Sequence, residues 1–233
     1  MRSSVWSALG NTYAVVEPDS GRSLTAAHAR ALVGDSDGIV EVVAASADDM
    51  TIVIWNPDGS QAELSGNGTR IAAAWLAERT GASRISVRVG ARATYATVRS
   101  NGDIEQDLGE VQVGPAEIVN GIELVPVSVG NPHVVVVGDP GDIQRIGPML
   151  ETHERFPDRT NVQVVRIDGP GEITARVWER GVGETQSSGT SAVAAAAATH
   201  SAGDVLVHFP GGDLRVRIAD GRARLIGRAE RVR

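Results

Sequence analysis

The stretch N-P-D-G-S-Q-A-E-L-S-G-N-G-T-R-I-A-A-A-W-L-A-E-R-T-G (56–81) predicts a glycine-rich turn that leads into a helix. A second stretch, E-R-G-V-G-E-T-Q-S-S-G-T-S-A-V-A-A-A-A-A-T-H (179–200), follows the same plan. Each places a Ser-Gly pair, Ser65-Gly66 and Ser188-Gly189, where its helix begins. Backbone N–H groups at a helix N-terminus lack intrahelical partners, and the helix dipole attracts anions there. Two such termini predict one anionic ligand held from two sides.

Neither helix has a polar face over most of its length. Residues 71–76 are apolar for nearly two turns, and residues 192–198 are apolar throughout. A helix that is apolar all round is normally buried all round. In a chain of 233 residues, this predicts a curved sheet wrapped around each helix, which we expect over residues 68–79 and 190–200.

Strand patterns and turn signals occur in both halves of the chain. A seam near residues 112–115 predicts one half over 1–113 and another over 114–225, with residues 226–233 free to return to the first half. Two further helices are expected, the first capped by Ser23 or Thr25, and Asn101-Gly102 indicates a hairpin. Residues 8–17 read as a turn at Gly10 and Asn11 that feeds a strand. The further helices cover residues 26–33 and 143–151, and the other strands 38–45, 50–55, 84–89, 93–99, 104–108, 122–129, 134–137, 162–167, 173–178, 205–209, 214–219 and 224–226. One long helix after a turn in each half indicates internal duplication.

Composition narrows the class of partner. The net charge is −7 and no lysine is present, which argues against nucleic acid or an anionic membrane as a partner. The absence of cysteine excludes disulfides and thiolate metal ligands, and no histidine pair has metal-ligand spacing, so we expect no metal. The first residues lack the apolar core of a signal peptide, so the cytoplasm is the expected location.

Taken singly, the candidate site residues have ordinary structural explanations. Serine is a common helix N-cap, asparagine is common in turns, and Glu179 and Arg180 would usually form a surface ion pair. His133 alone would more often be a hydrogen-bonded structural histidine. The combination of both Ser-Gly pairs with E-R-G (179–181) and N-P-H (131–133) favours a functional site.

These motifs together resemble the diaminopimelate epimerase family nearly end to end. G-N-T-Y-A-V-V-E (10–17) resembles the family's G-N-D-F strand, and D-G (37–38) its A-D-G turn. The two glycine-rich stretches resemble its signatures, which normally carry C-G-N-G and C-G-T. The resemblance also covers G-N-P-H, F-P-D-R-T-N-V and P-G-G-D-L, at residues 130–133, 156–162 and 210–214.

The resemblance implies an α+β fold of two pseudo-symmetric halves, each a barrel-like, mainly antiparallel sheet around a central helix. It implies cofactor-independent epimerisation of LL- to meso-diaminopimelate, in which one base removes the Cα proton and an acid on the other face returns it. The catalytic positions would be Ser65 and Ser188, with His133 and Glu179 close to them. Gly66, Asn67, Gly189 and Thr190 would bind the substrate carboxylate, and Asn11, Asn56, Asn131, Asn161 and Arg180 the distant end of the amino acid. A small amino acid is thus the expected partner, and a homodimer is left open.

The chain departs from the family pattern at the catalytic positions, where Ser65 and Ser188 stand in place of two cysteines, and Thr12 stands in place of aspartate. A thiol has a pKa near ~8.5, which a helix N-terminus can lower. An alcohol is on the order of five pKa units weaker as an acid, so its alkoxide costs roughly 7 kcal/mol more to form. Serine therefore needs a neighbour to activate it, and His133 and Glu179 are the sequence candidates.

Several explanations of the serines remain open. They could be deliberate replacements that trap an inactive form, or they could mark a natural branch in which His133 or Glu179 carries the proton. A chemistry like that of proline and hydroxyproline racemases, epimerases or dehydratases is the alternative reaction, since related families of this fold use Ser or Thr at one position. A non-catalytic amino-acid binder is the third alternative.

Overall fold

A computed structural model describes residues 1–19, 22–62 and 65–232, so Glu63 and Leu64 of the first glycine-rich stretch lie outside the described residues. The chain forms two compact units, one of Met1–Asp107 with Ile226–Arg233 and the other of Leu108–Leu225. The expected boundary was at residue 113, whereas the observed one follows Asp107 inside strand β8 (Asp103–Glu110). The turn signals near residues 112–115 mark the end of that continuous strand instead. The chain returns to the first unit in β18 (Arg222–Arg228).

The described residues of the first unit form a mixed sheet and two helices. Its strands are β1 (Arg2–Ala8), β2 (Asn11–Glu17), β3 (Gly38–Ala45), β4 (Asp49–Trp55), β5 (Gln61–Ala62), β6 (Arg84–Val89), β7 (Arg92–Val98) and β19 (Glu230–Arg231), and its helices are α1 (Ala26–Leu32) and α2 (Gly66–Thr80). Strand β2 pairs in parallel with β3, and β4 in parallel with β6. The pairs β1–β2, β3–β4, β4–β5 and β6–β7 are antiparallel.

The second unit repeats this topology. Its strands are β9 (Gln112–Val113), β10 (Glu117–Val119), β11 (Ile122–Ser128), β12 (Pro132–Val137), β13 (Asn161–Gly169), β14 (Glu172–Glu179), β15 (Gly183–Thr185), β16 (Gly203–Phe209) and β17 (Gly212–Ala219). Its helices are α3 (Ile143–Glu151), preceded by the 3-10 turn Pro140–Asp142, and α4 (Gly189–Thr199). The pairs β12–β13 and β14–β16 are parallel, and β11–β12, β13–β14, β14–β15 and β16–β17 are antiparallel. The order of parallel and antiparallel pairs is that of the first unit, which indicates an internal duplication.

The strand registers extend this equivalence to single residues. Tyr13 of β2 lies opposite Gly38, and His133 of β12 lies opposite Asn161. A tryptophan lies near the end of an equivalent strand in both units: Trp55 is the last residue of β4, and Trp178 is the last but one of β14. Ser65 and Ser188 each follow that tryptophan by ten positions. Tyr13 and His133 therefore occupy equivalent places, as do the two serines.

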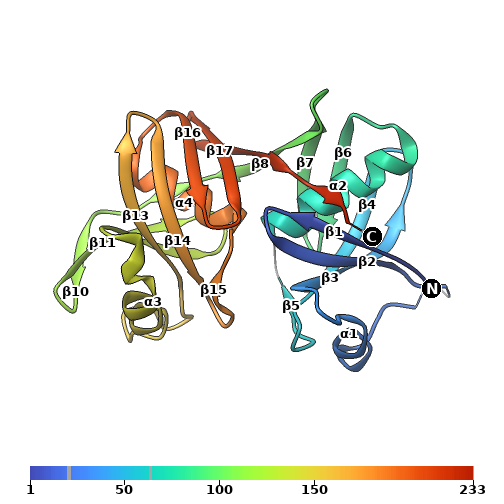
Figure 1. Ribbon diagram of the computed structural model, residues 1–233, viewed down its shortest axis with the longest axis horizontal. Helices are drawn as coiled ribbons and strands as arrows, with labels where there is room; N and C mark the ends of the chain where they lie inside the picture. The colour runs from blue at the N-terminus through green and yellow to red at the C-terminus, as the bar shows by residue number, and fades with distance from the viewer. Residues whose placement is uncertain (20–21, 63–64, 233) are drawn as a thin grey trace. The chain divides into compact units, whose positions relative to one another are not determined.

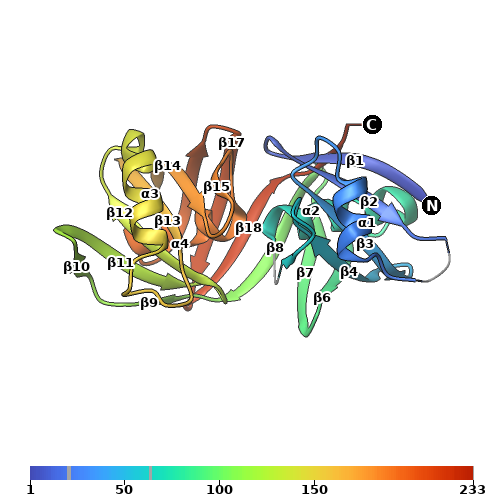
Figure 2. The same ribbon diagram turned by 90° about the horizontal axis from the view of Figure 1, so that it is seen from below.

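Each unit encloses its long helix, as the apolar sequences predicted. Helix α2 packs against β1, β2, β3, β4, β6 and β7 (Figure 1), and α4 packs against the equivalent strands β11, β12, β13, β14, β16 and β17 (Figure 2). All residues from Gly66 to Leu76 and from Gly189 to Ala196 are buried. Helix α2 begins two residues before the expected start, because Ser65 takes the N-cap position.

The shorter elements show where sequence patterns were informative. Thr25, not Ser23, caps α1 by accepting a hydrogen bond from the backbone N–H of His28. Helix α3 has the expected bounds. Strand β1 was not predicted because its serines hide the alternation that buries Trp6 and Ala8. No helix within the described part of the chain has the length and apolarity that a membrane crossing requires.

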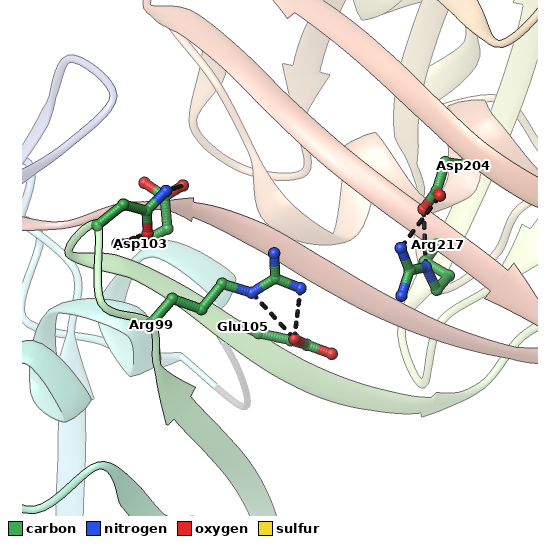
Figure 3. Close-up of polar contacts among 6 residues, drawn as sticks. Arg99, Asp103, Glu105, Asp204 and Arg217 are labelled. Atoms are coloured by element: carbon green, nitrogen blue, oxygen red, sulfur yellow. Dashed lines mark hydrogen bonds and ion pairs between the residues drawn. The ribbon is translucent and has the colours of Figure 1, made fainter.

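The expected Asn101-Gly102 hairpin joins β7 to β8. Gly102 has φ +85°, and the backbone N–H of Arg99 donates to Asp103 O at 2.8 Å. Arg99 Nη2 also pairs with Glu105 Oε2 at 2.7 Å (Figure 3). The second unit has a two-pronged pair of Arg217 with Asp204 across β16 and β17, with Nε–Oδ1 at 2.8 Å and Nη2–Oδ2 at 3.1 Å (Figure 3). These pairs are part-exposed, so each contributes at most about 1 kcal/mol.

Helix α3 approaches Trp178 so closely that residue 147 has no room for a side chain. A Cβ added to Gly147 would lie 2.7 Å from both Cβ and Cγ of Trp178. We expect Gly147→Ala to lower the free energy of unfolding by about 1–3 kcal/mol, even though alanine favours helix. Urea unfolding measures this loss. Gly169→Ala is the control, because its Cβ would meet nothing within 4 Å; equal stability of both variants would contradict the steric argument.

Candidate active site

In the first unit, Ser65 is held at the start of α2 by two hydrogen bonds of its hydroxyl. Its Oγ accepts from the backbone N–H of Gly68 at 3.0 Å and lies 3.2 Å from the Tyr13 hydroxyl. The backbone at Ser65 is extended, with φ −135° and ψ 119°, as expected for an N-cap. Among the described residues, the backbone N–H of Gly66 has no hydrogen-bond partner. The turn therefore presents a hydroxyl and a free amide donor together.

A buried cation, Arg70, lies behind this turn. Its side chain donates to Gly66 O at 3.2 Å and to the side-chain oxygen of Asn67. Burial lowers the pKa of Arg70 to about 10, while the charge of Tyr13 acts in the opposite direction. Its Nε has no hydrogen-bond partner within the described ranges. Among the described residues, no carboxylate forms an ion pair with this guanidinium, so its positive charge adds to the field at the start of α2.

In the second unit, Ser188 begins α4 but is less constrained. Its side chain makes no capping hydrogen bond and has no partner among the described residues, although Ser188 is only 5% exposed. The backbone N–H groups of Gly189 and Thr190 are also without partners in this part of the chain. Equivalent helix termini thus differ: one serine is tied to a tyrosine, and the other is available.

His133 belongs to a buried network behind α4. Its Nε2 lies 3.0 Å from Asn131 Oδ1, and its Nδ1 lies 3.1 Å from Gln163 Nε2. Gln163 Nε2 also donates to Ser191 Oγ at 3.0 Å. Since Gln163 donates to Nδ1, the histidine carries its proton on Nε2 and donates to Asn131. Burial lowers the pKa of His133 to about 3, with the charge of Arg180 as a smaller cause, so the ring is neutral at pH 7.

The E-R-G turn after β14 is fixed by two side chains from other elements. Glu151 Oε1 accepts from the backbone N–H of Gly181 at 2.6 Å, and its Oε2 accepts from Trp178 Nε1 at 2.8 Å. Asn161 Oδ1 accepts from the backbone N–H of Arg180 at 3.0 Å, while its Nδ2 donates to Pro132 O at 2.8 Å. Asn161 therefore ties this turn to the start of β12.

The remaining predicted residues occupy the ends of strands and helices around the two serines. Asn11 is buried at the start of β2, and Asn56 follows β4, where its Nδ2 donates to Ser60 Oγ at 2.9 Å. Glu179 ends β14 and accepts from Thr185 Oγ1 at 2.6 Å, and Arg180 Nη1 donates to Asp158 O at 3.2 Å. The first unit thus gathers Asn11, Asn56, Ser65, Gly66 and Asn67, and the second gathers Asn131, His133, Asn161, Glu179, Arg180, Ser188, Gly189 and Thr190. No group of three metal-ligating side chains occurs in the described ranges.

Comparison with known proteins decides the family. The family model described as diaminopimelate epimerase matches residues 4–119 and 125–232. The chain belongs to the diaminopimelate epimerase family. A diaminopimelate epimerase of Desulforudis audaxviator is 34% identical, covering 96% of this chain and 94% of its own length. Another, from Pelotomaculum thermopropionicum, is 36% identical over 80% of this chain and 78% of its own length. These relatives are isomerases by name.

Solved structures agree on the fold. A predicted epimerase from Pseudomonas aeruginosa aligns with a TM-score of 0.78 and 18% identity, covering 100% of this chain and 97% of that one. A hydroxyproline epimerase from Agrobacterium vitis aligns with a TM-score of 0.71 and 14% identity, covering 99% and 88%. The sheet-dominated α+β fold expected from the resemblance is confirmed.

Sequence reasoning missed four residues of this diaminopimelate epimerase fold. Tyr13 and Arg70 belong to the motifs G-N-T-Y and N-G-T-R, but nothing in these motifs shows that the two residues interact. Gln163 and Glu151 carry no motif signal. They join the site only because the fold brings β13 beside β12 and α3 beside β14.

Proposed function

We propose that this diaminopimelate epimerase family member is a cofactor-independent amino-acid epimerase that acts on diaminopimelate, with Ser65 and Ser188 in the two proton-carrying positions. The observation that supports this most directly is the duplicated Ser-Gly helix terminus, reached from equivalent strands in both units. Relatives at 34–36% identity are named for this reaction. The family cysteines would then be replaced by serines that must work with neighbouring groups.

The helix termini supply what removal of a Cα proton requires. Loss of this proton places negative charge on the substrate carboxylate and on Cα, and backbone N–H donors stabilise such charge. Gly66, Gly189 and Thr190 provide partnerless donors among the described residues. The dipoles of α2, with 15 residues, and α4, with 11, each place a positive end beside the serine that begins the helix.

The geometry suggests different roles for His133 and Glu179, the two residues expected to activate serine. His133 is neutral, and both its ring nitrogens are engaged by Asn131 and Gln163, so we assign it to positioning the first turn of α4 through Ser191. Glu179 remains our candidate for a proton acceptor beside Ser188. The other predicted residues, namely Asn11, Asn56, Asn67, Asn131, Asn161 and Arg180, would hold the substrate.

The test is proton NMR of LL- and meso-diaminopimelate incubated with the protein in D2O, following loss of the Cα–H signal. We expect the unaltered protein to exchange this proton, and Glu179→Gln to slow it by on the order of 10²-fold. The Ser65→Cys/Ser188→Cys variant should exchange faster, because a thiol ionises more readily. Ser201→Cys is the matched control, since it places a thiol on an exposed turn.

Each outcome decides between the alternatives. If only the double cysteine variant exchanges the proton, the scaffold is an epimerase and serine has silenced it. If diaminopimelate binds but no variant exchanges its Cα proton, the protein is an amino-acid binder. If diaminopimelate neither binds nor exchanges, the substrate is wrong, and proline and hydroxyproline are tested in the same way. A cytoplasmic location belongs to the same proposal, and cell fractionation tests it.

A further inference from the structure

We propose that Tyr13 and Ser65 form a proton relay, in which Ser65 faces the substrate and Tyr13 takes up and returns the proton. This rests on the proposed epimerase function. Tyr13 acts through Ser65, so it is a positioning residue for proton transfer and does not itself touch the substrate.

The hydrogen bonds around Ser65 allow its hydroxyl to donate to the Tyr13 hydroxyl. A serine hydroxyl has one donor and two acceptor sites. Ser65 Oγ uses one acceptor site for the backbone N–H of Gly68 at 3.0 Å and lies 3.2 Å from Tyr13 Oη. The O–H of Ser65 can therefore point at Tyr13, and the second acceptor site is left for a substrate proton.

The tyrosine ring is held in this place by the missing side chain of Gly38. Its strand partner across β2 and β3 is Gly38 itself, and a Cβ there would lie 2.7 Å from Tyr13 Cε1 and 2.8 Å from Trp55 O. The Cε1 edge of the ring therefore occupies the space that a side chain at position 38 would fill. Its hydroxyl can then reach a residue that follows it by 52 positions in the chain.

A relay removes the need to form a serine alkoxide, which is costly because an alcohol is a weak acid. A phenol has a pKa near ~10, several units below that of an alcohol, so phenolate is the accessible base. When the Cα–H bond breaks, its proton passes to Ser65 Oγ, the Ser65 proton passes to phenolate Tyr13, and the electron pair stays on the substrate as a carbanion. In the reverse direction, phenolic Tyr13 donates through Ser65 to Cα. No charge is left on the serine.

Arg70 favours the charged state of this relay. It is fully buried, its Nε has no partner among the described residues, and it is electrostatically coupled to Tyr13. Two acidic residues on or beside the neighbouring strand β3 accept hydrogen bonds from other groups. Asp37 accepts from the backbone N–H and hydroxyl of Thr12, and Glu41 accepts from Trp55 and Leu24. The positive charge of the buried Arg70 therefore favours the phenolate form of Tyr13.

The relay belongs to the first unit alone. The equivalent of Tyr13 in the second unit is His133, whose ring nitrogens contact Asn131 and Gln163 instead of Ser188. The two faces of the reaction would thus use different proton carriers. Because the equilibrium constant fixes the ratio of the forward and reverse kcat/KM values, substitution of Tyr13 should lower both by the same factor.

Titration of Tyr13 tests the coupling without substrate. The chain has two tyrosines, and Tyr95 is 67% exposed on β7, so Tyr95→Phe leaves Tyr13 as the sole ultraviolet reporter of phenolate. In this background, we expect Arg70→Met to move the Tyr13 transition upward by about one pH unit or more. Arg88→Met removes an exposed arginine as the control. Equal transitions in both variants overturn the relay.

Proton exchange supplies the second test and remains available if Arg70→Met does not fold. Tyr13→Phe should slow Cα exchange by on the order of 10²-fold, and the alkaline rise of its pH–rate profile should disappear. Adding Ser65→Cys to Tyr13→Phe should restore exchange, because a thiol carries the proton without help. Wild-type exchange in Tyr13→Phe, or no rescue by Ser65→Cys, overturns the relay. If no protein exchanges the proton at all, the proposed function fails, and the titration still decides the coupling.

Discussion

Glu151→Ala is expected to lower the free energy of unfolding of the second unit by about 2–4 kcal/mol, because its buried carboxylate accepts several hydrogen bonds and each hydrogen bond to a charged group contributes about 1.5–3 kcal/mol. The Glu151 carboxylate is 5% exposed and accepts from Trp178, Gly181 and Arg159, the last at 2.5 Å. Alanine would remove the acceptor of the half-buried Trp178 indole N–H and of the Gly181 backbone N–H. Chemical denaturation with tryptophan fluorescence measures the loss.

Glu151→Gln separates charge from shape. Glutamine has one acceptor oxygen and one donor nitrogen, so Trp178 or Gly181 must face a donor, and we expect a loss of about 1–3 kcal/mol. Glu154→Ala is the control, because it removes an exposed carboxylate just after α3. If Glu151→Ala behaves like Glu154→Ala, the carboxylate does not hold the turn. In a protein that exchanges the Cα proton, Glu151→Ala should also raise KM for diaminopimelate, because it loosens the turn that carries Arg180.

Acid should destabilise the protein through His133. Its pKa is about 3 in the folded state because of burial, against 6.5 for an ordinary histidine. Between these values the unfolded chain binds a proton that the folded chain excludes, so stability falls as the pH falls. One pKa unit corresponds to about 1.4 kcal/mol, which gives a loss of roughly 2 kcal/mol between pH 7 and pH 5. Denaturant unfolding at several pH values measures this slope.

Two histidine variants show whether the slope comes from His133. His133→Gln lacks the titrating group, so its stability should change less between pH 7 and pH 5. His208 acts in the opposite sense, because Asp213 and Glu172 accept from its ring and raise its pKa. Its contribution is present at low pH and is lost as the pH rises through the folded-state pKa, so His208→Gln should steepen the acid loss. An unchanged slope in His133→Gln would contradict the assignment.

The sequence predicted the two long helices and the serines that begin them better than it predicted the domain boundaries. Residues 71–76 and 192–198 identified two buried helices, because no rotation of such a helix offers water a polar face. Ser65 and Ser188 were identified at the helix starts by their glycine-rich context. Domain boundaries were less accurate, since turn residues near 112–115 cannot show that β8 belongs to both units.

The sequence by itself determined the family, the duplicated order of elements and the two serine-headed helices, because these depend on local residue types and spacing. Only the tertiary structure decided which groups act together. Strand register brings Tyr13 onto Gly38 and toward Ser65, and the neighbouring sheet strands bring Gln163 to His133. Burial then makes Arg70 an uncompensated cation and His133 a neutral ring. Long-range register and the exclusion of water fix these properties, and neither is written in a short stretch of sequence.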